Sequence, residues 1–233
     1  MESLDVYFFV YLVMPAIKVI TPILGGRYYH LFNRGNNGQQ VFFTEENYKF
    51  FLWQFYQFLN PFVDLLSYSL MPNHFHFLIK AKDSIPVLKD GIPLRLDESK
   101  DSIFLKEMES PTDEVEIGKI VSNQLRRFFI TYSMAINKQE NRTGSLFSKN
   151  FKRLEIEDQD YLKYVAFYIH FNPEKHGLIE DFRNYKFSSW KAYNSTKSSA
   201  LNRELLLEFY GGPNEFIGYH SHFHEERELI LLE

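Results

Sequence analysis

The sequence predicts an α+β protein in which antiparallel strands combine with amphipathic helices. Hydrophobic residues fill 45% of the 233 positions and aromatic residues 18%, which indicates a globular chain with a sizeable core. Residues 74–80 alternate between aromatic or aliphatic and polar side chains after the turn dipeptide Pro72-Asn73. This pattern predicts an antiparallel hairpin with the strand before the turn. Residues 44–59 instead show the spacing of a helix that buries one face.

The first part of the chain contains two strands with a helix between them. An alternating run over residues 27–35 predicts the first strand, and the Gly and Asn residues of positions 35–38 predict the turn that ends it. Thr44 suits the N-cap of a helix that reaches about residue 59 and ends before Pro61. Residues 63–70 then form the second strand, which precedes the hairpin turn.

The middle of the chain begins with an acidic segment, at about residues 83–116, that contains three prolines. This composition predicts an insertion or a flexible linker. Residues 117–136 have the periodicity of a helix, and residues 145–156 form a long alternating run that predicts a strand.

The last part of the chain is predicted to be mainly helical. Asp158 suits the N-cap of a helix over residues 161–170, and Asn172-Pro173 is expected to end it. Residues 183–193 read as a loop with a short helical turn. Two further helices are expected, over residues 203–209 and 215–232.

These elements suggest a main domain over residues 25–200, an N-terminal extension over residues 1–24 and a helical tail over residues 201–233. The apolar run at residues 6–14 is shorter than the roughly 20 residues of a membrane helix, so no membrane partner is expected. The chain has no Cys, which excludes disulfides and Cys-based zinc sites. This composition is compatible with a reducing cytoplasm, the expected location.

The net charge of −4 conceals a basic segment between residues 119 and 153. Eight Lys and Arg residues fall in this segment against a single acid, Glu140. A basic block in an otherwise acidic chain is typical of a surface that binds a polyanion, although a solvated helix and hairpin would give the same count.

His74 and His76 stand at alternate positions of the predicted hairpin strand, so both imidazoles lie on one face of the sheet. Two His side chains fixed side by side suit two ligands of one divalent metal. A half-exposed strand with two outward polar residues would show the same pattern.

Tyr164, Tyr168 and Asn172 recur every four residues and therefore share one face of the predicted helix. An Asn side chain can supply a neutral oxygen ligand, and a phenol can attack a phosphate that a metal polarises. Ordinary helix packing, with Asn172 as a C-terminal cap, would also account for the spacing.

The two halves together resemble a known family. His74-Phe75-His76 resembles the His-hydrophobic-His (HUH) motif of single-tyrosine transposases, in particular the REP-associated tyrosine transposases and the insertion-sequence relatives that recognise DNA hairpins. The other segments that resemble this family, in the expected order, are Tyr29-His30 with Asn33-Arg34-Gly35, Gly144-Ser145-Leu146-Phe147, Tyr168-Ile169-His170-Phe171-Asn172-Pro173, and Ser188-Ser189-Trp190 with Tyr193.

The resemblance implies an antiparallel sheet with helices packed on one face, of ferredoxin- or RRM-like type, with the histidine strand central and the tyrosine helix across it. It further implies that His74 and His76 bind Mg²⁺ or Mn²⁺, with Asn172 as third ligand. Many relatives have Gln at the last position, and Asn is one methylene shorter. Tyr168 would be the nucleophile because it precedes a carboxamide by one helical turn, and Tyr164 is its rival.

The implied activity is a transposase-type cleavage of single-stranded DNA beside a hairpin, with strand transfer through a 5′-phosphotyrosine. The residues expected to contact DNA are Asn33, Arg34, Arg126, Arg127, Phe147, Lys149, Lys152 and Arg153. Trp190 is a second candidate, beside Phe147, for stacking on a base. A domesticated nucleic-acid-binding protein of the same fold, and a metallohydrolase that activates water, are the alternatives. A homodimer is compatible with the resemblance, since related transposases work as dimers, and so is a monomer.

Overall fold

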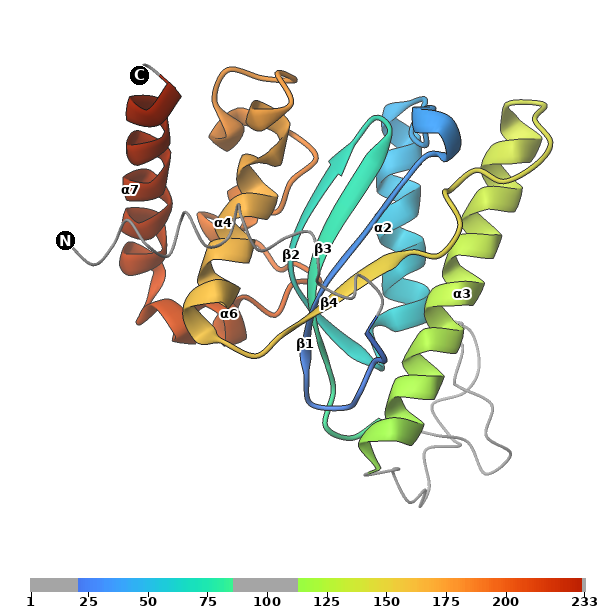
Figure 1. The fold of residues 1–233 in the computed structure, drawn as a ribbon, viewed down its shortest axis with the longest axis horizontal. Helices are drawn as coiled ribbons and strands as arrows, with labels where there is room; N and C mark the ends of the chain where they lie inside the picture. The colour runs from blue at the N-terminus through green and yellow to red at the C-terminus, as the bar shows by residue number, and fades with distance from the viewer. Residues whose placement is uncertain (1–20, 86–112, 232–233) are drawn as a thin grey trace.

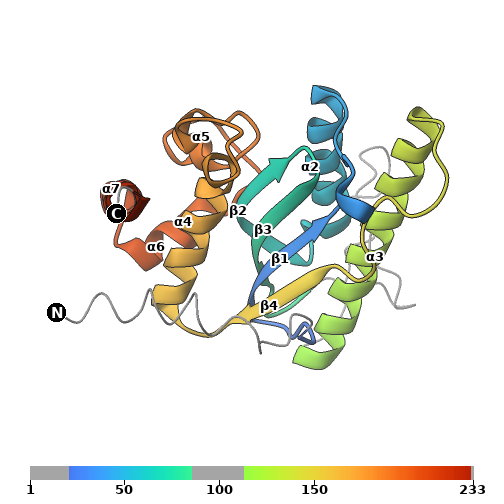
Figure 2. The same cartoon turned by 45° about the horizontal axis from the view of Figure 1, so that its top comes forward.

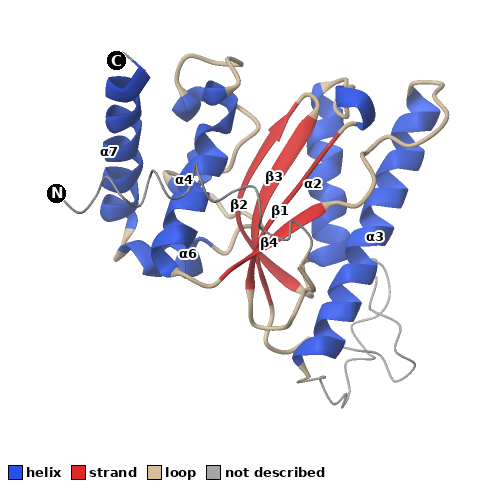
Figure 3. Ribbon diagram, in the orientation of Figure 1, coloured by secondary structure: helices blue, strands red, loops and turns tan. Residues whose placement is uncertain are grey.

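The computed structural model describes residues 21–85 and 113–231. One antiparallel sheet contains four strands in the order β2-β3-β1-β4 (Figure 3). The strands are β1 (Tyr28–Arg34), β2 (Val63–Met71), β3 (His74–Ala81) and β4 (Lys152–Ile156). The predicted α+β class is confirmed, and β2 and β3 form the predicted hairpin. The histidine strand β3 lies inside the sheet, between β2 and β1.

Helices α2 (Glu45–Leu59) and α3 (Glu114–Gln139) cover one face of the sheet (Figures 1 and 2). Thr44 is the N-cap of α2, as predicted. Phe51 of α2 packs against Phe75 of β3 and Phe128 of α3, with ring centroids 5.1 and 4.7 Å apart. Because successive strand residues alternate between faces, the burial of Phe75 and Phe77 under these helices directs His74 and His76 to the opposite face.

Helix α4 (Gln159–Lys175) covers part of that opposite face (Figure 2). Asp158 caps it as predicted, since its carboxylate accepts a hydrogen bond from the Tyr161 N–H at 2.7 Å. Phe167 lies in one apolar cluster with Leu66 of β2 and Leu78 of β3. The sheet is therefore flanked by helices on both sides, and α4 brings its own side chains toward the histidine face.

The predicted end of this helix at Asn172-Pro173 is wrong, because α4 continues to Lys175 with Pro173 inside it. Pro173 has no N–H to donate to the Ile169 carbonyl, which weakens the helix locally. Phe171, Asn172 and Pro173 are all buried, however, and this packing outweighs the local signal. His176 is the C-cap and lies beyond the predicted end.

The strand predicted over residues 145–156 is also shorter than expected, since β4 begins only at Lys152. Asn150 adopts a left-handed conformation (φ 58°), which interrupts the extended chain before it. Phe147 keeps an isolated bridge to Gly35, and the Ser148 N–H donates to the Arg34 carbonyl at 2.9 Å. Residues 145–151 are therefore an irregular segment that lies beside the end of β1 and leads into β4.

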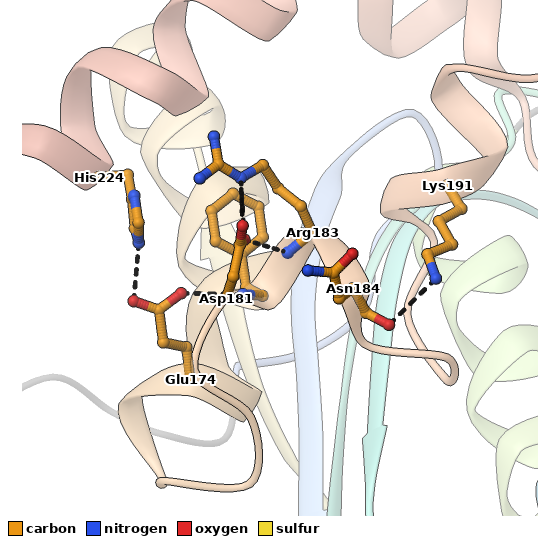
Figure 4. A network of polar contacts seen from close by, with 7 residues as sticks. Glu174, Asp181, Arg183, Asn184, Lys191 and His224 are labelled. Atoms are coloured by element: carbon orange, nitrogen blue, oxygen red, sulfur yellow. Dashed lines mark hydrogen bonds and ion pairs between the residues drawn. The ribbon is translucent and has the colours of Figure 1, made fainter.

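The helices predicted in the C-terminal tail are present as α6 (Arg203–Tyr210) and α7 (Pro213–Leu231). The predicted loop before them contains the short helix α5 (Trp190–Tyr193) and the 3₁₀ turn η2 (Phe182–Asn184), and a similar turn, η1 (Asn36–Gly38), follows β1. Figure 4 shows the contact between His224 of α7 and Glu174 of α4, whose atoms lie 2.7 Å apart. The other oxygen of Glu174 accepts from the Phe182 N–H at 2.8 Å.

Within residues 21–85 and 113–231, no helix has the length and hydropathy needed to cross a membrane. Most of the predicted N-terminal extension and most of the acidic insertion lie outside the described residues. The boundaries predicted for the domain and its tail stay predictions.

A buried chain of hydrogen bonds joins α7 to the sheet through two His side chains. The Phe216 carbonyl can only accept, so His220 Nδ1 donates to it at 2.9 Å, and His220 Nε2 accepts from His170 Nδ1 at 3.0 Å. His170 Nε2 then accepts from the Ser189 hydroxyl at 2.7 Å, and Ser189 accepts from the Tyr68 N–H at 2.8 Å. The two acceptor positions, Nε2 of His220 and Nε2 of His170, require both imidazoles to be neutral.

We expect the free energy of unfolding to decrease as the pH falls below about 6.5, the pKa of His in an unfolded chain. Burial lowers the pKa of His220 to about 3 in the folded protein. Between these values the unfolded chain binds a proton that the folded chain excludes, so stability is complete above pH 6.5 and is lost toward acid. One such His contributes a slope of about 1.4 kcal/mol per pH unit.

Urea unfolding from about pH 7.5 to about pH 5 measures this slope. In the His220→Gln variant, the slope of the unfolding free energy against pH is expected to be smaller by the contribution of one His, about 1.4 kcal/mol per pH unit. A slope that is the same in both proteins would contradict the neutral state assigned to His220.

Candidate functional site

A cleft of about 810 Å³ opens between α4 and the neighbouring ends of β1 and β3. His74 and His76 of β3 line it together with Tyr168 and Asn172 of α4. The sequence predicted these four side chains from two separate segments, and the fold brings them to one cavity. A smaller apolar pocket of about 220 Å³ lies against β2 and contains none of them.

Each of the two predicted metal-binding His side chains has its Nδ1 atom in a hydrogen bond. His74 Nδ1 lies 2.6 Å from Asn73 Oδ1, and His76 Nδ1 lies 2.9 Å from Nε2 of His30 on β1. An amide oxygen only accepts, so His74 carries its proton on Nδ1, and the lone pair is on Nε2. The same arrangement arises at His76 when its Nδ1 donates to His30. Both Nε2 atoms are then suited to bind a metal.

The three His side chains of this group are neutral near pH 7 because burial disfavours their charged forms. Burial lowers the pKa of His74 to about 4, with smaller effects of the nearby His176 and Arg34. Burial also lowers the pKa of His30 to about 3 and that of His76 well below its ordinary value. Neutral imidazole is the form that binds metals, so protons do not compete for these atoms at neutral pH.

Asn172 is fully buried, and its two amide atoms differ in their surroundings. Its Nδ2 donates to the Tyr168 carbonyl at 2.8 Å, whereas its Oδ1 has no hydrogen-bond partner among the described residues. A buried carbonyl oxygen without a partner costs roughly 1–3 kcal/mol, which a metal ligand bond or a bound donor would offset. The donor set of two imidazoles and one amide oxygen can therefore hold a divalent metal, the class to which the predicted Mg²⁺ and Mn²⁺ belong, with positions left for water and phosphate oxygens.

A metal site built from at least three His, Cys, Asp or Glu side chains is absent from the described part of the chain. An oxygen from outside that set, such as the one on Asn172, would have to complete the coordination by His74 and His76.

Tyr168 is half-buried, and its ring contacts those of His76 and His30. Its ring centroid is 5.9 Å from that of His76 and 6.1 Å from that of His30, with both ring pairs edge to face. The Lys175 ammonium lies 4.8 Å from the same ring centroid, close enough for a cation–π contact. A phenol in this position can reach a phosphate bound beside the two His side chains.

The rival tyrosine, Tyr164, is one helical turn farther from the cleft and does not line it. Its ring packs against Phe223 of α7 at 6.2 Å and against Tyr168 at 6.4 Å. Tyr164 therefore packs against the apolar cluster between α4 and α7.

The residues predicted to contact DNA divide into two groups in the structure. Asn33, Arg34, Lys149 and Lys152 line the cleft. Arg126 and Arg127 are exposed on α3, which packs on the other face of the sheet, and Arg153 stands on that face beside Phe151. Phe147 is 5% exposed within the core, and Trp190 is 6% exposed between Phe182 and Phe216. Burial leaves neither ring available for stacking on a base.

Sequence reasoning assigned no site role to four residues in or beside the cleft. Phe32 and His176 line it, whereas His30 and Lys175 contact the side chains of His76 and Tyr168 that do. His30 and Phe32 alternate along β1 as His74 and His76 do along β3, and this pattern could have revealed them. His176 continues the four-residue spacing of Tyr168 and Asn172, and its ring lies 4.8 Å from that of His74. Lys175 and His176 were missed because the helix was expected to end at Asn172-Pro173.

No family model matches the sequence, and no curated protein matches it. Among solved structures, the chain is similar to a REP-associated tyrosine transposase bound to a REP hairpin, with a TM-score of 0.52 and 15% identity. The match covers 78% of this chain and 86% of that one. A bacterial tRNA(His) guanylyltransferase-like protein in complex with GTP is 10% identical over 79% of this chain and 80% of its own, but its TM-score of 0.37 supports no argument. The first likeness shows that the two proteins share a fold.

Proposed function

We propose that this chain is a metal-dependent, transposase-type endonuclease and strand-transferase that acts on single-stranded DNA beside a hairpin. The observation that carries the proposal is the meeting of Tyr168 and Asn172 from α4 with His74 and His76 from β3 in one cleft. The fold shared with a transposase that binds a REP hairpin supports DNA as the partner.

The metal site would use Nε2 of His74, Nε2 of His76 and Oδ1 of Asn172. Bound there, Mg²⁺ or Mn²⁺ would stabilise negative charge on a phosphate oxygen as a Lewis acid. The contribution of the chain is to fix the ligands beforehand: Asn73 and His30 hold the two rings through their Nδ1 atoms. Fixed ligands reduce the entropy that binding would otherwise cost.

Tyr168 would carry out the covalent step. Its phenolic oxygen attacks the phosphorus of the scissile phosphodiester, and the bond from phosphorus to the 3′ oxygen breaks. The phenol loses its proton, and the leaving strand takes up a proton as a 3′-hydroxyl. The 5′ end of the other strand stays linked to the protein as a phosphotyrosine, which keeps the bond energy for strand transfer.

The cations that line the cleft would hold the DNA backbone. Arg34, Lys149 and Lys152 stand on its rim, and salt should weaken their contribution. The predicted contacts of Arg126, Arg127 and Arg153 would require DNA that also reaches the other face of the sheet, so the cleft cations are the main candidates.

A covalent-adduct assay tests the proposal. A pool of hairpin-bearing oligonucleotides with randomised flanks is labelled at the 3′ end, incubated with the protein and Mn²⁺, and separated on a denaturing gel. Label that migrates with the protein is expected, since Tyr168 would retain the 5′ end of the labelled fragment. Binding without any cleaved product would instead favour a nucleic-acid-binding protein, and cleavage without an adduct would favour a hydrolase that uses water.

His30→Leu is expected to lower the affinity for Mn²⁺ by about 10- to 100-fold, since a ligand imidazole loses its hydrogen-bond partner. Calorimetric titration of the protein with Mn²⁺ measures the effect without DNA. His30→Gln is the matched control: its amide oxygen can accept from His76 Nδ1 and should recover part of the affinity. Equal affinity in the wild type and the Leu variant would remove His30 from this role.

A further inference from the structure

Phe32 lies on the floor of the cleft, between the predicted metal site and a cation. It is directly opposite His76 on β3 and opposite Lys152 on β4, so the three side chains form a row across the sheet. The ring of Phe32 is tilted by 19° from that of His76, with centroids 5.6 Å apart, and the Lys152 ammonium lies 5.8 Å from its centre.

The order of groups along this row matches one nucleotide step. Adjacent strands are about 4.8 Å apart. The row therefore begins at the imidazole on β3, continues with the aromatic ring on β1, and ends at the ammonium group on β4, two strand spacings from β3. A single strand presents a phosphate, a base and the next phosphate in the same sequence. A phosphate bound beside His74 and His76 would therefore bring the neighbouring base close to Phe32.

The burial of Phe32 distinguishes it from the aromatic residues that hold the core together. Phe75 packs against the helices on the opposite face of the sheet and is fully buried, whereas Phe32 is half-buried on the cleft face. The rings first expected to stack on DNA, Phe147 and Trp190, are buried among other core side chains. An aromatic ring that stays accessible beside a cation is the arrangement that proteins use to bind single-stranded bases.

We propose that Phe32 forms a nucleobase-binding subsite, on which the base next to the scissile phosphate stacks while Lys152 binds the following phosphate. This inference rests on the proposed function, because it assumes single-stranded DNA in the cleft. Stacking accepts any base, so the subsite would hold the strand in register without selecting its sequence.

A comparison of two probes separates stacking from charge. One probe is a fluorescent dodecamer of thymidine, and the other has the same phosphates but abasic sites in place of every base. In an anisotropy titration, the wild type is expected to bind the thymidine probe about 5- to 150-fold more tightly through stacking at this position. Phe32→Leu should lose most of this preference and bind the abasic probe as the wild type does, whereas Phe32→Tyr should retain it.

The matched control is Trp53→Leu, which removes an aromatic ring that is 57% exposed on α2, on the far side of the sheet. It should change neither affinity. If Phe32→Leu keeps the full preference, or weakens both probes equally, the subsite is wrong. An adduct formed by the wild type in the covalent assay would then leave the proposed function intact. A wild type that neither binds these probes nor forms an adduct would overturn the function and the subsite together.

Discussion

Tyr168→Phe is expected to abolish the covalent protein–DNA adduct while it leaves DNA binding unchanged. The substitution removes one oxygen atom and retains the ring that packs over His76 and His30. Without that oxygen no phosphotyrosine can form, so adduct formation should fall by at least about 10³-fold, to the limit of detection. The readout is transfer of the 3′ label to the protein on a denaturing gel, beside an anisotropy titration of the same oligonucleotides.

Tyr164→Phe provides the comparison on the same helix, one turn away. Tyr164 packs toward Phe223 and does not line the cleft, so this variant should form the adduct at close to the wild-type rate. The opposite result, an adduct that persists in Tyr168→Phe and disappears in Tyr164→Phe, would transfer the nucleophile to Tyr164. Such a result would require α4 to rotate or to shift relative to the sheet.

The sequence was sufficient to predict the parts of the fold that strong local patterns specify. The hairpin turn at Pro72-Asn73 and the alternation after it fix which side chains of β3 face the helices, and the caps at Thr44 and Asp158 fix two helix starts. One error arose where tertiary packing outweighs a local signal, and the other where a single backbone conformation interrupts an alternating pattern. Burial of residues around Pro173 carries α4 past a proline, and the left-handed Asn150 shortens β4.

Three separate causes explain which parts of the candidate site were missed. An early end for α4 hid Lys175 and His176, although both lie in regular helical spacing from Tyr168 and Asn172. The hydrogen bond between His30 and His76 joins residues 46 positions apart and depends on the register of β1 against β3. Charge counts could not separate the cations of the cleft from those behind the sheet, because this separation depends on strand alternation and on where α3 packs.

His76→Gln is expected to remove most Mn²⁺ binding and, with it, adduct formation by about 10³-fold or more, since the lost charge stabilisation amounts to several kcal/mol. The residue is buried, and Gln fills much of the same space with a polar side chain, which limits the damage to the fold. His74→Gln gives the same test at a half-buried position. Calorimetric titration with Mn²⁺ should show the loss in both variants, and thermal unfolding without metal checks that each is folded.

A substitution at Asn172 tests whether its side chain is the third metal ligand or only a packing residue of α4. Asn172→Leu removes a buried oxygen that has no hydrogen-bond partner in the described part of the chain. The change should stabilise the metal-free protein by about 1–3 kcal/mol, less about 0.5–1.5 kcal/mol for the bond to the Tyr168 carbonyl. If Oδ1 binds the metal, the same change weakens Mn²⁺ affinity, so stability and metal affinity move in opposite directions. Asn172→Gln keeps the oxygen and should retain binding. A Leu variant with wild-type Mn²⁺ affinity would show that His74 and His76 hold the ion without this side chain.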